Sequence, residues 1–247
     1  MLEVKNIGFS VTDEVRGGQL EIIEDVSFTL PDGKFLVITG PNGGGKSTLA
    51  RLIMGIEKPT KGQILYNGTD ITSLSITERA KLGIGYAFQQ PPRFKGLTVR
   101  KLLSLAHGSD LPENECCSYL TKVGLCSMDY LNREVDASLS GGEVKRIEIA
   151  TLMARNLGLA IYDEPEAGID LWSFSMLVQS FRDIAAERNE SVMIISHQER
   201  ILSIADTIVI VGGGTVQKTG TPAELNDELF GGRFTTASCR KQEAMFQ

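Results

Sequence analysis

The sequence of 247 residues lacks any apolar run long enough to cross a membrane. A spanning helix needs about 20 apolar residues, whereas the longest apolar runs here, such as residues 35–38 and 207–211, have the length of a β-strand. The first residues also lack the basic segment followed by an apolar segment that marks a secretory signal. We therefore expect a cytoplasmic protein that does not insert directly into a membrane.

Cysteine is scarce and irregularly spaced. The four cysteines do not have the dense, even spacing of a secreted disulfide scaffold, and no two form a Cys-x-x-Cys pair. Their spacing does not match that of iron–sulfur cluster ligands either. We expect ordinary thiols at Cys116, Cys117, Cys126 and Cys239.

A basic excess is also absent. Twenty-five lysines and arginines stand against 31 aspartates and glutamates, which gives a net charge of −6. A protein that wraps nucleic acid needs clustered positive charge, so we expect no nucleic-acid partner. A small phosphate site is still compatible with this composition, because such sites are built mainly from backbone N–H groups.

The pattern of apolar residues predicts one α/β domain over residues 1–230. Alternating apolar residues before residue 30 predict strands joined by a hairpin at Gly17 and Gly18, followed by a strand at 34–39 and a helix at 46–55. After residue 139, helices at 144–155 and 171–187 alternate with strands at 157–162 and 191–196. This alternation predicts a mostly parallel sheet flanked by helices.

Residues 91–135 differ from the rest of the domain. They contain no long β-branched runs, and residues 99–106 and 113–123 show helical spacing of apolar side chains. We expect a small helical subdomain inserted into a core made of residues 1–90 and 136–230. The polar residues 231–247 are expected to form a loosely held tail.

A phosphate-binding loop follows the strand predicted at 34–39. Residues 40–48 match G-x-x-x-x-G-K-[ST], with a strand before and a helix after the motif. Glycines let backbone N–H groups turn toward phosphate oxygens, Lys46 supplies a cation, and Ser47 offers a hydroxyl to Mg²⁺. The predicted nucleotide-binding residues are Gly40, Pro41, Asn42, Gly43, Gly44, Gly45, Lys46, Ser47 and Thr48.

Two adjacent carboxylates, Asp163 and Glu164, end the strand predicted at 157–162. Adjacent strand residues point to opposite faces, so the two acids are expected to have different tasks. Asp163 is placed to reach Mg²⁺ beside the phosphate loop. Glu164 is placed to orient and deprotonate the attacking water.

Ser140, Gly141, Gly142 and Glu143 open the helix that continues through residue 155. Ser140 and Glu143 have the spacing of a capping box, and the glycine pair also exposes N–H groups that suit a γ-phosphate. Both interpretations can hold together. Since the phosphate loop already holds the nucleotide of its own chain, this second anion site predicts a head-to-tail dimer in which each copy closes the other's ATP.

In this combination the sequence resembles the ATP-binding cassette (ABC) ATPases, over about 220 residues and with all motifs in family order. Residues 88–91 resemble the Q-loop of the family, 139–143 its signature, 167–170 its D-loop and 196–197 its switch histidine. The resemblance implies the phosphate-loop NTPase fold of an ABC core, a mostly parallel sheet with an N-terminal antiparallel β region. It also implies a Mg²⁺-dependent ATPase whose cofactors are ATP and Mg²⁺.

The resemblance also implies roles for individual residues. Gln89 would join Ser47 and Asp163 around Mg²⁺, and His197 would contact the γ-phosphate and the attacking water. Asp170 would couple the two sites of a dimer. The γ-phosphate of the opposite copy would be bound by Ser140, Gly141 and Gly142. The second histidine, His107, is interpreted as a surface or packing residue.

One departure concerns the base. The family usually stacks an aromatic residue on adenine at the position of Val11, and Val11 cannot stack. Phe9 lies on the same strand two residues earlier. Weak contacts to the base, and weak discrimination against GTP, are therefore expected.

Three segments (85–93, 163–170 and 196–202) are similar to the SufC-type members of the family, which act in iron–sulfur cluster assembly. That likeness implies a soluble β-helical scaffold of the SufB/SufD type as partner. The alternative is the nucleotide-binding subunit of a membrane transporter. A regulatory or DNA-repair ABC module is disfavoured, because residues 91–135 are too short for a long coiled coil and hold no zinc-ligand set.

Overall fold

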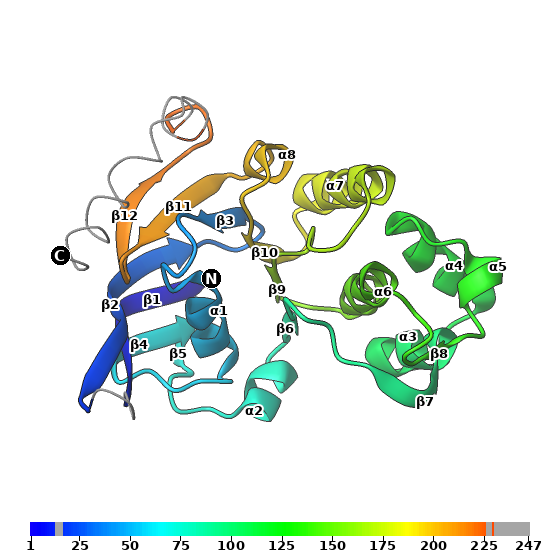
Figure 1. Cartoon of the computed structure of the whole chain (residues 1–247), viewed down its shortest axis with the longest axis horizontal. Helices are drawn as coiled ribbons and strands as arrows, with labels where there is room; N and C mark the ends of the chain where they lie inside the picture. Colours follow the sequence, from blue (N-terminus) through cyan, green and yellow to red (C-terminus); the bar gives the residue numbers. More distant parts are fainter. Residues whose placement is uncertain (13–16, 226–228, 230–247) are drawn as a thin grey trace.

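The computed structural model describes residues 1–12, 17–225 and 229 (Figure 1). Ten strands form one mixed sheet in the order β5-β4-β1-β2-β12-β11-β3-β10-β9-β6. The predicted α/β fold, with a mostly parallel core and an antiparallel N-terminal region, is confirmed. The expected tail at 231–247 lies outside the described residues, as do residues 13–16 of the predicted hairpin.

The parallel core of the sheet is buried on both faces. Its strands are β3 (Phe35–Thr39), β6 (Ile84–Ala87), β9 (Leu159–Asp163), β10 (Ser191–Ile195) and β11 (Thr207–Gly212). In β3, Phe35 and Val37 pack into one hydrophobic cluster, and Leu36 and Ile38 pack into the other. This follows from the alternation of side chains along a strand, and it explains why these strands are almost wholly apolar.

The antiparallel region extends the sheet on the other side of β11. Strand β2 pairs antiparallel with β1, which pairs antiparallel with β4. The predicted alternation in β2 is confirmed, because Val26 and Leu30 are buried whereas Ser27 and Thr29 are exposed. The strands here are β1 (Leu2–Thr12), β2 (Gln19–Leu30), β4 (Lys61–Tyr66), β5 (Thr69–Asp70) and β12 (Thr215–Gly220).

Helices cover the two faces of the sheet. Side chains of α1 join the cluster shared with the antiparallel strands, and those of α6 and α7 join the cluster shared with the helical subdomain. The helices are α1 (Lys46–Met54), α2 (Ile76–Lys81), α6 (Gly141–Met153), α7 (Leu171–Glu187) and α8 (Glu199–Leu202). The prediction for α7 is confirmed at both ends, whereas α6 begins three residues before the predicted start, directly after its cap Ser140.

The helical subdomain lies beside the core, next to α6 and α7 (Figure 1). It contains α3 (Val99–His107) and α4 (Glu113–Lys122), which confirm the two predicted helices, and the short α5 (Ser127–Tyr130), which was not predicted. It also contains a small antiparallel pair that was not predicted, β7 (Phe94–Thr98) with β8 (Glu134–Val135). The pair is short and includes Gly96 at positive φ, so it leaves little periodicity to detect.

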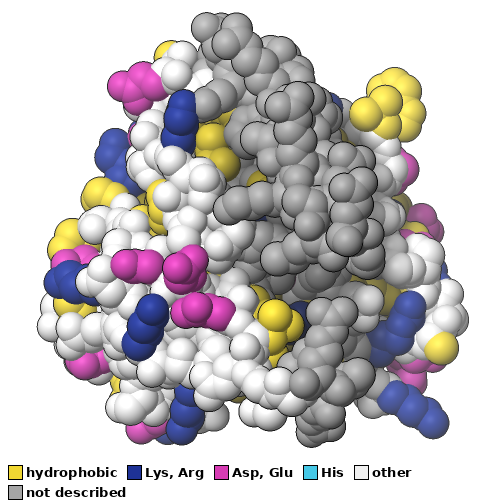
Figure 2. All heavy atoms as spheres, turned by 60° about the vertical axis from the view of Figure 1, so that its left-hand side comes forward, with side chains coloured by type: hydrophobic (Ala, Val, Ile, Leu, Met, Phe, Trp, Pro, Cys, Tyr) yellow, Lys and Arg dark blue, Asp and Glu magenta, His cyan; other side chains and the backbone are white. Residues whose placement is uncertain are grey.

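The side of the molecule that carries the antiparallel strands displays acidic and basic side chains interspersed among the described residues (Figure 2). Within residues 1–12, 17–225 and 229, no helix has both the length and the apolar character that a membrane crossing requires.

Candidate active site

The phosphate loop joins β3 to α1 at the carboxyl end of the parallel strands. Its backbone depends on glycine at two places. Gly40 has a φ of 131°, and a Cβ there would lie 2.0 Å from the carbonyl oxygen of Val211. Gly45 has a φ of 93°, and a Cβ there would meet Ile23 at 2.4 Å. The loop is therefore closely packed against β11 and β2, with Asn42 and Gly43 exposed.

Lys46 points back into this loop. Its Nζ donates hydrogen bonds to the carbonyl oxygens of Gly40 at 2.8 Å and Pro41 at 2.9 Å, and the side chain is almost fully buried. Burial lowers the pKa of Lys46, while Glu164 and Asp163 act in the opposite direction. A buried cation inside a glycine-rich loop at a helix N-terminus fits the β- and γ-phosphates of a nucleotide.

Ser47 and Asp163 meet beside the loop, as the sequence predicts. Ser47 Oγ donates to Asp163 Oδ1 at 2.9 Å, and the Tyr86 hydroxyl donates to Asp163 Oδ2 at 2.8 Å. Burial raises the pKa of Asp163, although these two hydrogen bonds oppose the shift. A hydroxyl and a carboxylate at this distance are oxygen ligands of the kind that Mg²⁺ prefers, so the residues present fit the metal.

Glu164 adopts a backbone conformation that was not predicted from the sequence. Strand β9 ends at Asp163, and Glu164 follows with a φ of 46°, its N–H bonded to the carbonyl of Ile195 at 3.0 Å. Because β9 ends at Asp163, the alternation of side chains along a strand does not set the direction of Glu164. Gln89 Nε2 donates to Glu164 Oε2 at 2.7 Å. The structure thus places Gln89 on Glu164, whereas the expected contact was with the metal ligands.

The switch histidine closes another side of the site. His197 Nδ1 lies 3.3 Å from Thr39 Oγ1 at the end of β3, and burial lowers the pKa of His197, which favours the neutral ring. The neighbouring Ser196 hydroxyl donates to Glu166 Oε1 at 2.6 Å. Burial raises the pKa of Glu166. Its other oxygen, Oε2, is buried without a hydrogen-bond partner among the described residues.

The signature loop precedes α6. Ser140 caps the helix, since its side chain accepts from the N–H of Glu143 at 3.3 Å while Glu143 Oε2 accepts from the N–H of Ser140 at 2.6 Å. The predicted capping box is confirmed. Gly141 faces open space, because a Cβ there would have no neighbour within 4 Å. The second predicted anion site is therefore sterically accessible.

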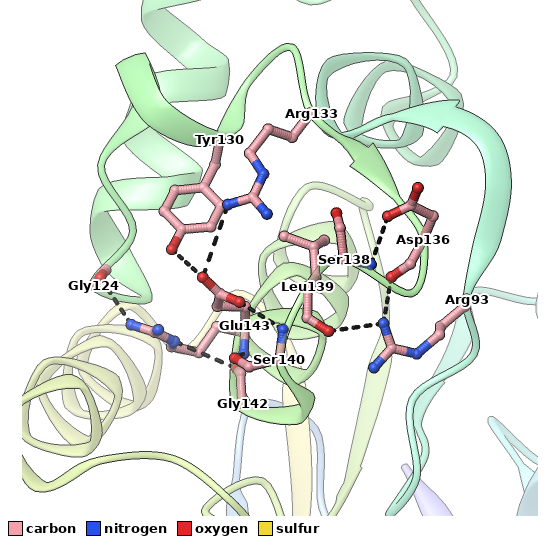
Figure 3. A network of polar contacts seen from close by, with 11 residues as sticks. Arg93, Gly124, Tyr130, Arg133, Asp136, Ser138, Leu139, Ser140, Gly142 and Glu143 are labelled. Atoms are coloured by element: carbon pink, nitrogen blue, oxygen red, sulfur yellow. Dashed lines mark hydrogen bonds and ion pairs between the residues drawn. The ribbon is translucent and has the colours of Figure 1, made fainter.

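Side chains of the helical subdomain hold this loop in place (Figure 3). Arg93 donates to the carbonyl oxygens of Asp136 and Leu139, the latter at 2.9 Å. The Tyr130 hydroxyl donates to Glu143 Oε1, which lowers the pKa of Glu143 to about 2. Together with the capping box, these hydrogen bonds connect the signature loop to the subdomain and to α6 itself.

The D-loop packs against the signature loop. A Cβ at Gly142 would lie 2.3 Å from the carbonyl oxygen of Gly168, so the two loops are in close contact. Asp170 caps α7, since its carboxylate accepts from the N–H groups of Trp172 and Ser173 at 3.1 and 3.0 Å. Within one chain Asp170 therefore has a structural task, and its coupling of two sites stays a prediction.

Two charged residues of α6, Lys145 and Glu148, contribute to the site although the sequence analysis did not predict a role for them. Lys145 Nζ donates to the carbonyl oxygens of Phe88 and Asp163, and Glu148 Oε1 accepts from the N–H of Phe88 at 2.9 Å. Both are largely buried, and burial raises the pKa of Glu148 to about 7. Together they clamp the Q-loop backbone beside Gln89. The sequence did contain a signal for this pair. The two charged residues are three apart on a helix whose neighbouring apolar residues are buried.

The remaining predicted residues lie away from this cluster. His107 is exposed, as expected, and its Nδ1 lies 2.8 Å from Ser109 Oγ. Val11 is exposed near the end of β1, while Phe9 packs against the core. Cys116 is buried and Cys126 exposed, both as free thiols, and the described residues contain no cluster of three or more potential metal-ligating side chains. Cys239 lies outside the described residues.

Comparison with known proteins gives a consistent result. A family model described as ABC transporter matches residues 23–167. An ABC transporter ATP-binding protein of Methanocaldococcus jannaschii, MJ0035, is 40% identical over 218 residues, with 85% of this chain and 87% of that protein covered. The sulfate/thiosulfate import ATP-binding protein CysA of a Synechocystis strain is 32% identical over 84% of this chain, which spans 59% of that relative.

Three further similarities concern chain length and fold. A probable ATP-dependent transporter of Cyanophora paradoxa, ycf16, is 33% identical over 93% of this chain and 91% of its own length. Among solved structures, the dimeric bacterial ABC transporter cassette MJ0796 superposes with a TM-score of 0.80 at 23% identity, with 90% of this chain and 98% of that chain covered. An ATP-bound Atm1-family exporter superposes with a TM-score of 0.80 at 23% identity over 97% of this chain and 42% of that chain.

Proposed function

The chain belongs to the ABC transporter family of ATPases, and from that membership we propose that two copies join on ATP and drive a conformational change in a partner protein. It is an ATPase that uses ATP and Mg²⁺. The observation that carries the proposal is the separation of the site into two parts. One part holds Lys46, Ser47 and Asp163. The other part is the accessible signature loop, which side chains of the helical subdomain hold in place.

Each part has a defined task in the proposed reaction. Lys46 and the loop amides bind the phosphates, and Ser47 with Asp163 supply oxygen ligands for the metal, which stabilises negative charge on the phosphates. Glu164 orients and deprotonates the attacking water, after Gln89 releases its carboxylate. His197 contacts the γ-phosphate. Ser140, Gly141 and Gly142 of the second copy bind the same phosphate from the other side.

The proposed motion follows from thermodynamic linkage between ATP binding and the closing of the dimer. A ligand moves an equilibrium only by its difference in affinity for two states. ATP held between two chains favours the closed dimer, and hydrolysis through Glu164 removes that preference. A partner attached to both copies is moved as the copies approach and separate.

The named relatives support a membrane transport subunit as that partner. MJ0035 and CysA are described as transporter ATP-binding proteins, and neither is named SufC. We place the chain in the cytoplasm, with the partner docked against the helical subdomain of residues 91–135.

A second candidate partner is a soluble scaffold of the SufB/SufD type. It is supported by residues 85–93, 163–170 and 196–202, whose sequence is similar to SufC-type ATPases. Arg200 of the last segment donates to Ser175 Oγ at 2.8 Å and lies over the ring of Phe174. The switch segment is thereby joined to α7, directly after the D-loop. Cross-linking in source cells followed by mass spectrometry separates the candidates: a polytopic membrane protein supports the transporter, and a soluble partner supports the scaffold.

A mixing experiment tests the shared site. Lys46→Ala disables the phosphate loop, and Gly141→Asp places a negative charge at the signature loop, where the added side chain meets no neighbour. Each variant alone should be nearly inactive. A mixture should recover about a quarter of the parent rate, because half of randomly formed dimers contain one intact site out of two.

The control is Gly141→Ala, which should retain ATPase activity because it adds volume without charge. An inactive mixture of Lys46→Ala and Gly141→Asp chains, with both variants folded, would contradict the shared site. So would full ATPase activity of the parent chain held as a monomer.

A further inference from the structure

The start of α7 exposes an unusual pair of apolar side chains. Leu171 is 73% exposed, and Trp172, the single tryptophan of the chain, is 83% exposed. Single exposed apolar residues are common, but tryptophan is highly buried on average. Tryptophan is also enriched among the residues that dominate protein–protein interfaces. We refer to Leu171 and Trp172 as the apolar knob.

Hydrogen bonds connect the first turn of α7, which carries the knob, to the signature loop. Asp170 fixes the first turn of α7 through the N–H groups of Trp172 and Ser173. Ser173 Oγ accepts from Arg146 Nη1 at 2.6 Å, and Arg146 also donates to the carbonyl of Gly142 at 3.4 Å. The D-loop touches Gly142 as well. Signature loop, D-loop and knob therefore form one continuous surface.

A cavity of about 410 Å³ lies beside the phosphate loop, on the side of the switch histidine. Its size is in the range of pockets that enclose small organic groups. Leu202 and Leu229 give it an apolar wall. Among the described residues, its lining comprises Thr39, Gly40, Pro41, Asn42, His197, Leu202 and Leu229.

We propose that the apolar knob of one copy inserts into this cavity of the second copy when the ATP-bound dimer forms. The inference rests on the proposed shared site, in which the signature loop of one copy covers the phosphate loop of the other. The knob is contiguous with the signature loop, and the cavity is contiguous with the phosphate loop. Placing the loops together therefore brings the knob to the cavity.

Symmetry explains why a second copy is the occupant. A two-fold interface is self-complementary, so a projecting feature and a matching hollow on the same chain are both used twice. Each copy would place Trp172 against Leu202 and Leu229 of the partner copy and would receive the same contact in return.

The single tryptophan makes the test direct, because all indole fluorescence of the chain comes from position 172. The experiment uses the full chain carrying Glu164→Gln, so that ATP is retained. Addition of Mg-ATP should shift the emission to shorter wavelength and protect it from acrylamide quenching. Sedimentation velocity on the same sample reports the dimer.

The second arm measures the dimer dissociation constant in saturating Mg-ATP. Trp172→Ala should raise it on the order of a thousandfold, because truncation of an interface hot spot weakens binding by roughly thirtyfold and the dimer contains two such contacts. Leu229→Asp changes the cavity side and should have a similar effect. Met128→Ala is the control. It removes an apolar side chain that is 92% exposed but lies on α5, outside the proposed contact, and it should leave the dissociation constant unchanged.

The outcomes are distinct. If the parent chain forms no dimer with Mg-ATP, the proposed function fails, and this inference fails with it. If the dimer forms while Trp172 stays open to acrylamide, or if Trp172→Ala dimerises as tightly as the parent, the inference alone is overturned. Unchanged binding of a fluorescent ATP analogue by monomeric Trp172→Ala and Leu229→Asp confirms that both variants retain a folded nucleotide site.

Discussion

The two halves of the nucleotide site are built in different ways. The phosphate-loop half is formed by backbone packed between strands, with Lys46 and Asp163 buried. The signature half is an exposed loop held by side chains of the helical subdomain, as Arg93 and Tyr130 illustrate (Figure 3). A rigid, buried half suits charge stabilisation, and an accessible half suits a surface that must meet and leave a second molecule.

The buried half should perform the hydrolysis step. The substitution Glu164→Gln should block this step without preventing nucleotide binding. The amide keeps the size of the side chain but cannot accept the proton of water, so kcat should fall by about 10²- to 10⁴-fold. Binding of Mg-ATP should persist, and dimers should accumulate. Steady-state phosphate release and sedimentation velocity measure both effects. A kcat within tenfold of the parent would show that another group acts as base.

The buried pair Lys145 and Glu148, which holds the Q-loop backbone, should make the stability of the fold depend on pH. Burial raises the pKa of Glu148 to about 7 in the folded chain, above its value of 4.5 when unfolded. The folded state then binds more protons between these values, so stability should fall as pH rises through that window, by up to about 3 kcal/mol. Denaturant unfolding at pH 5 and pH 8 measures the difference.

Glu148→Gln is the matched variant for this measurement, because an amide oxygen can still accept from the N–H of Phe88. Its unfolding free energy should depend less on pH than that of the parent. Glu190, whose pKa is also raised to about 7 by burial, is present in both chains and cancels in the comparison. Identical pH slopes for the two chains would show that Glu148 does not titrate in this window.

Within the buried half, Lys46 should govern nucleotide affinity. Lys46→Ala removes a charged hydrogen-bond donor to phosphate, worth about 1.5–3 kcal/mol, so ATP affinity should fall roughly 10- to 100-fold. Equilibrium titration with a fluorescent ATP analogue measures the loss. Lys46→Arg retains the positive charge but changes the shape of the side chain. It therefore distinguishes the contribution of charge to ATP affinity from that of steric fit. Near-native affinity of Lys46→Ala would contradict the assignment of the phosphate loop.

The smallest effect is expected at the signature half. Arg93 is exposed, and Arg93→Ala removes its bonds to the carbonyls of Asp136 and Leu139. ATP affinity of the monomer should be unchanged, while kcat should fall by a few-fold, since an exposed charged contact contributes at most about 1 kcal/mol. His107→Asn, on the outer surface of the subdomain, is the control. A loss of monomer ATP affinity in Arg93→Ala would show that the two halves are coupled within one chain.

Local features of the site were predictable from sequence, whereas its long-range contacts were not. The phosphate loop was predictable because its residues are contiguous and its glycines follow from backbone geometry. The bounds of α7 were predicted from the alternation of helical and strand segments after residue 139, whereas the cap at Asp170 was found only in the structure. The contact of Gln89 with Glu164 joins residues 75 apart, and that of Lys145 with Phe88 joins residues 57 apart. Such contacts depend on how the sheet places its strands, which local patterns do not encode.

The left-handed backbone of Glu164 has a consequence for engineering. A residue other than glycine at a φ of 46° carries strain of order 1–3 kcal/mol. Glycine would relieve that strain but would remove the carboxylate on which hydrolysis depends. Libraries screened only for heat resistance are therefore expected to enrich glycine at this position, and to yield robust chains that hold nucleotide without turning it over.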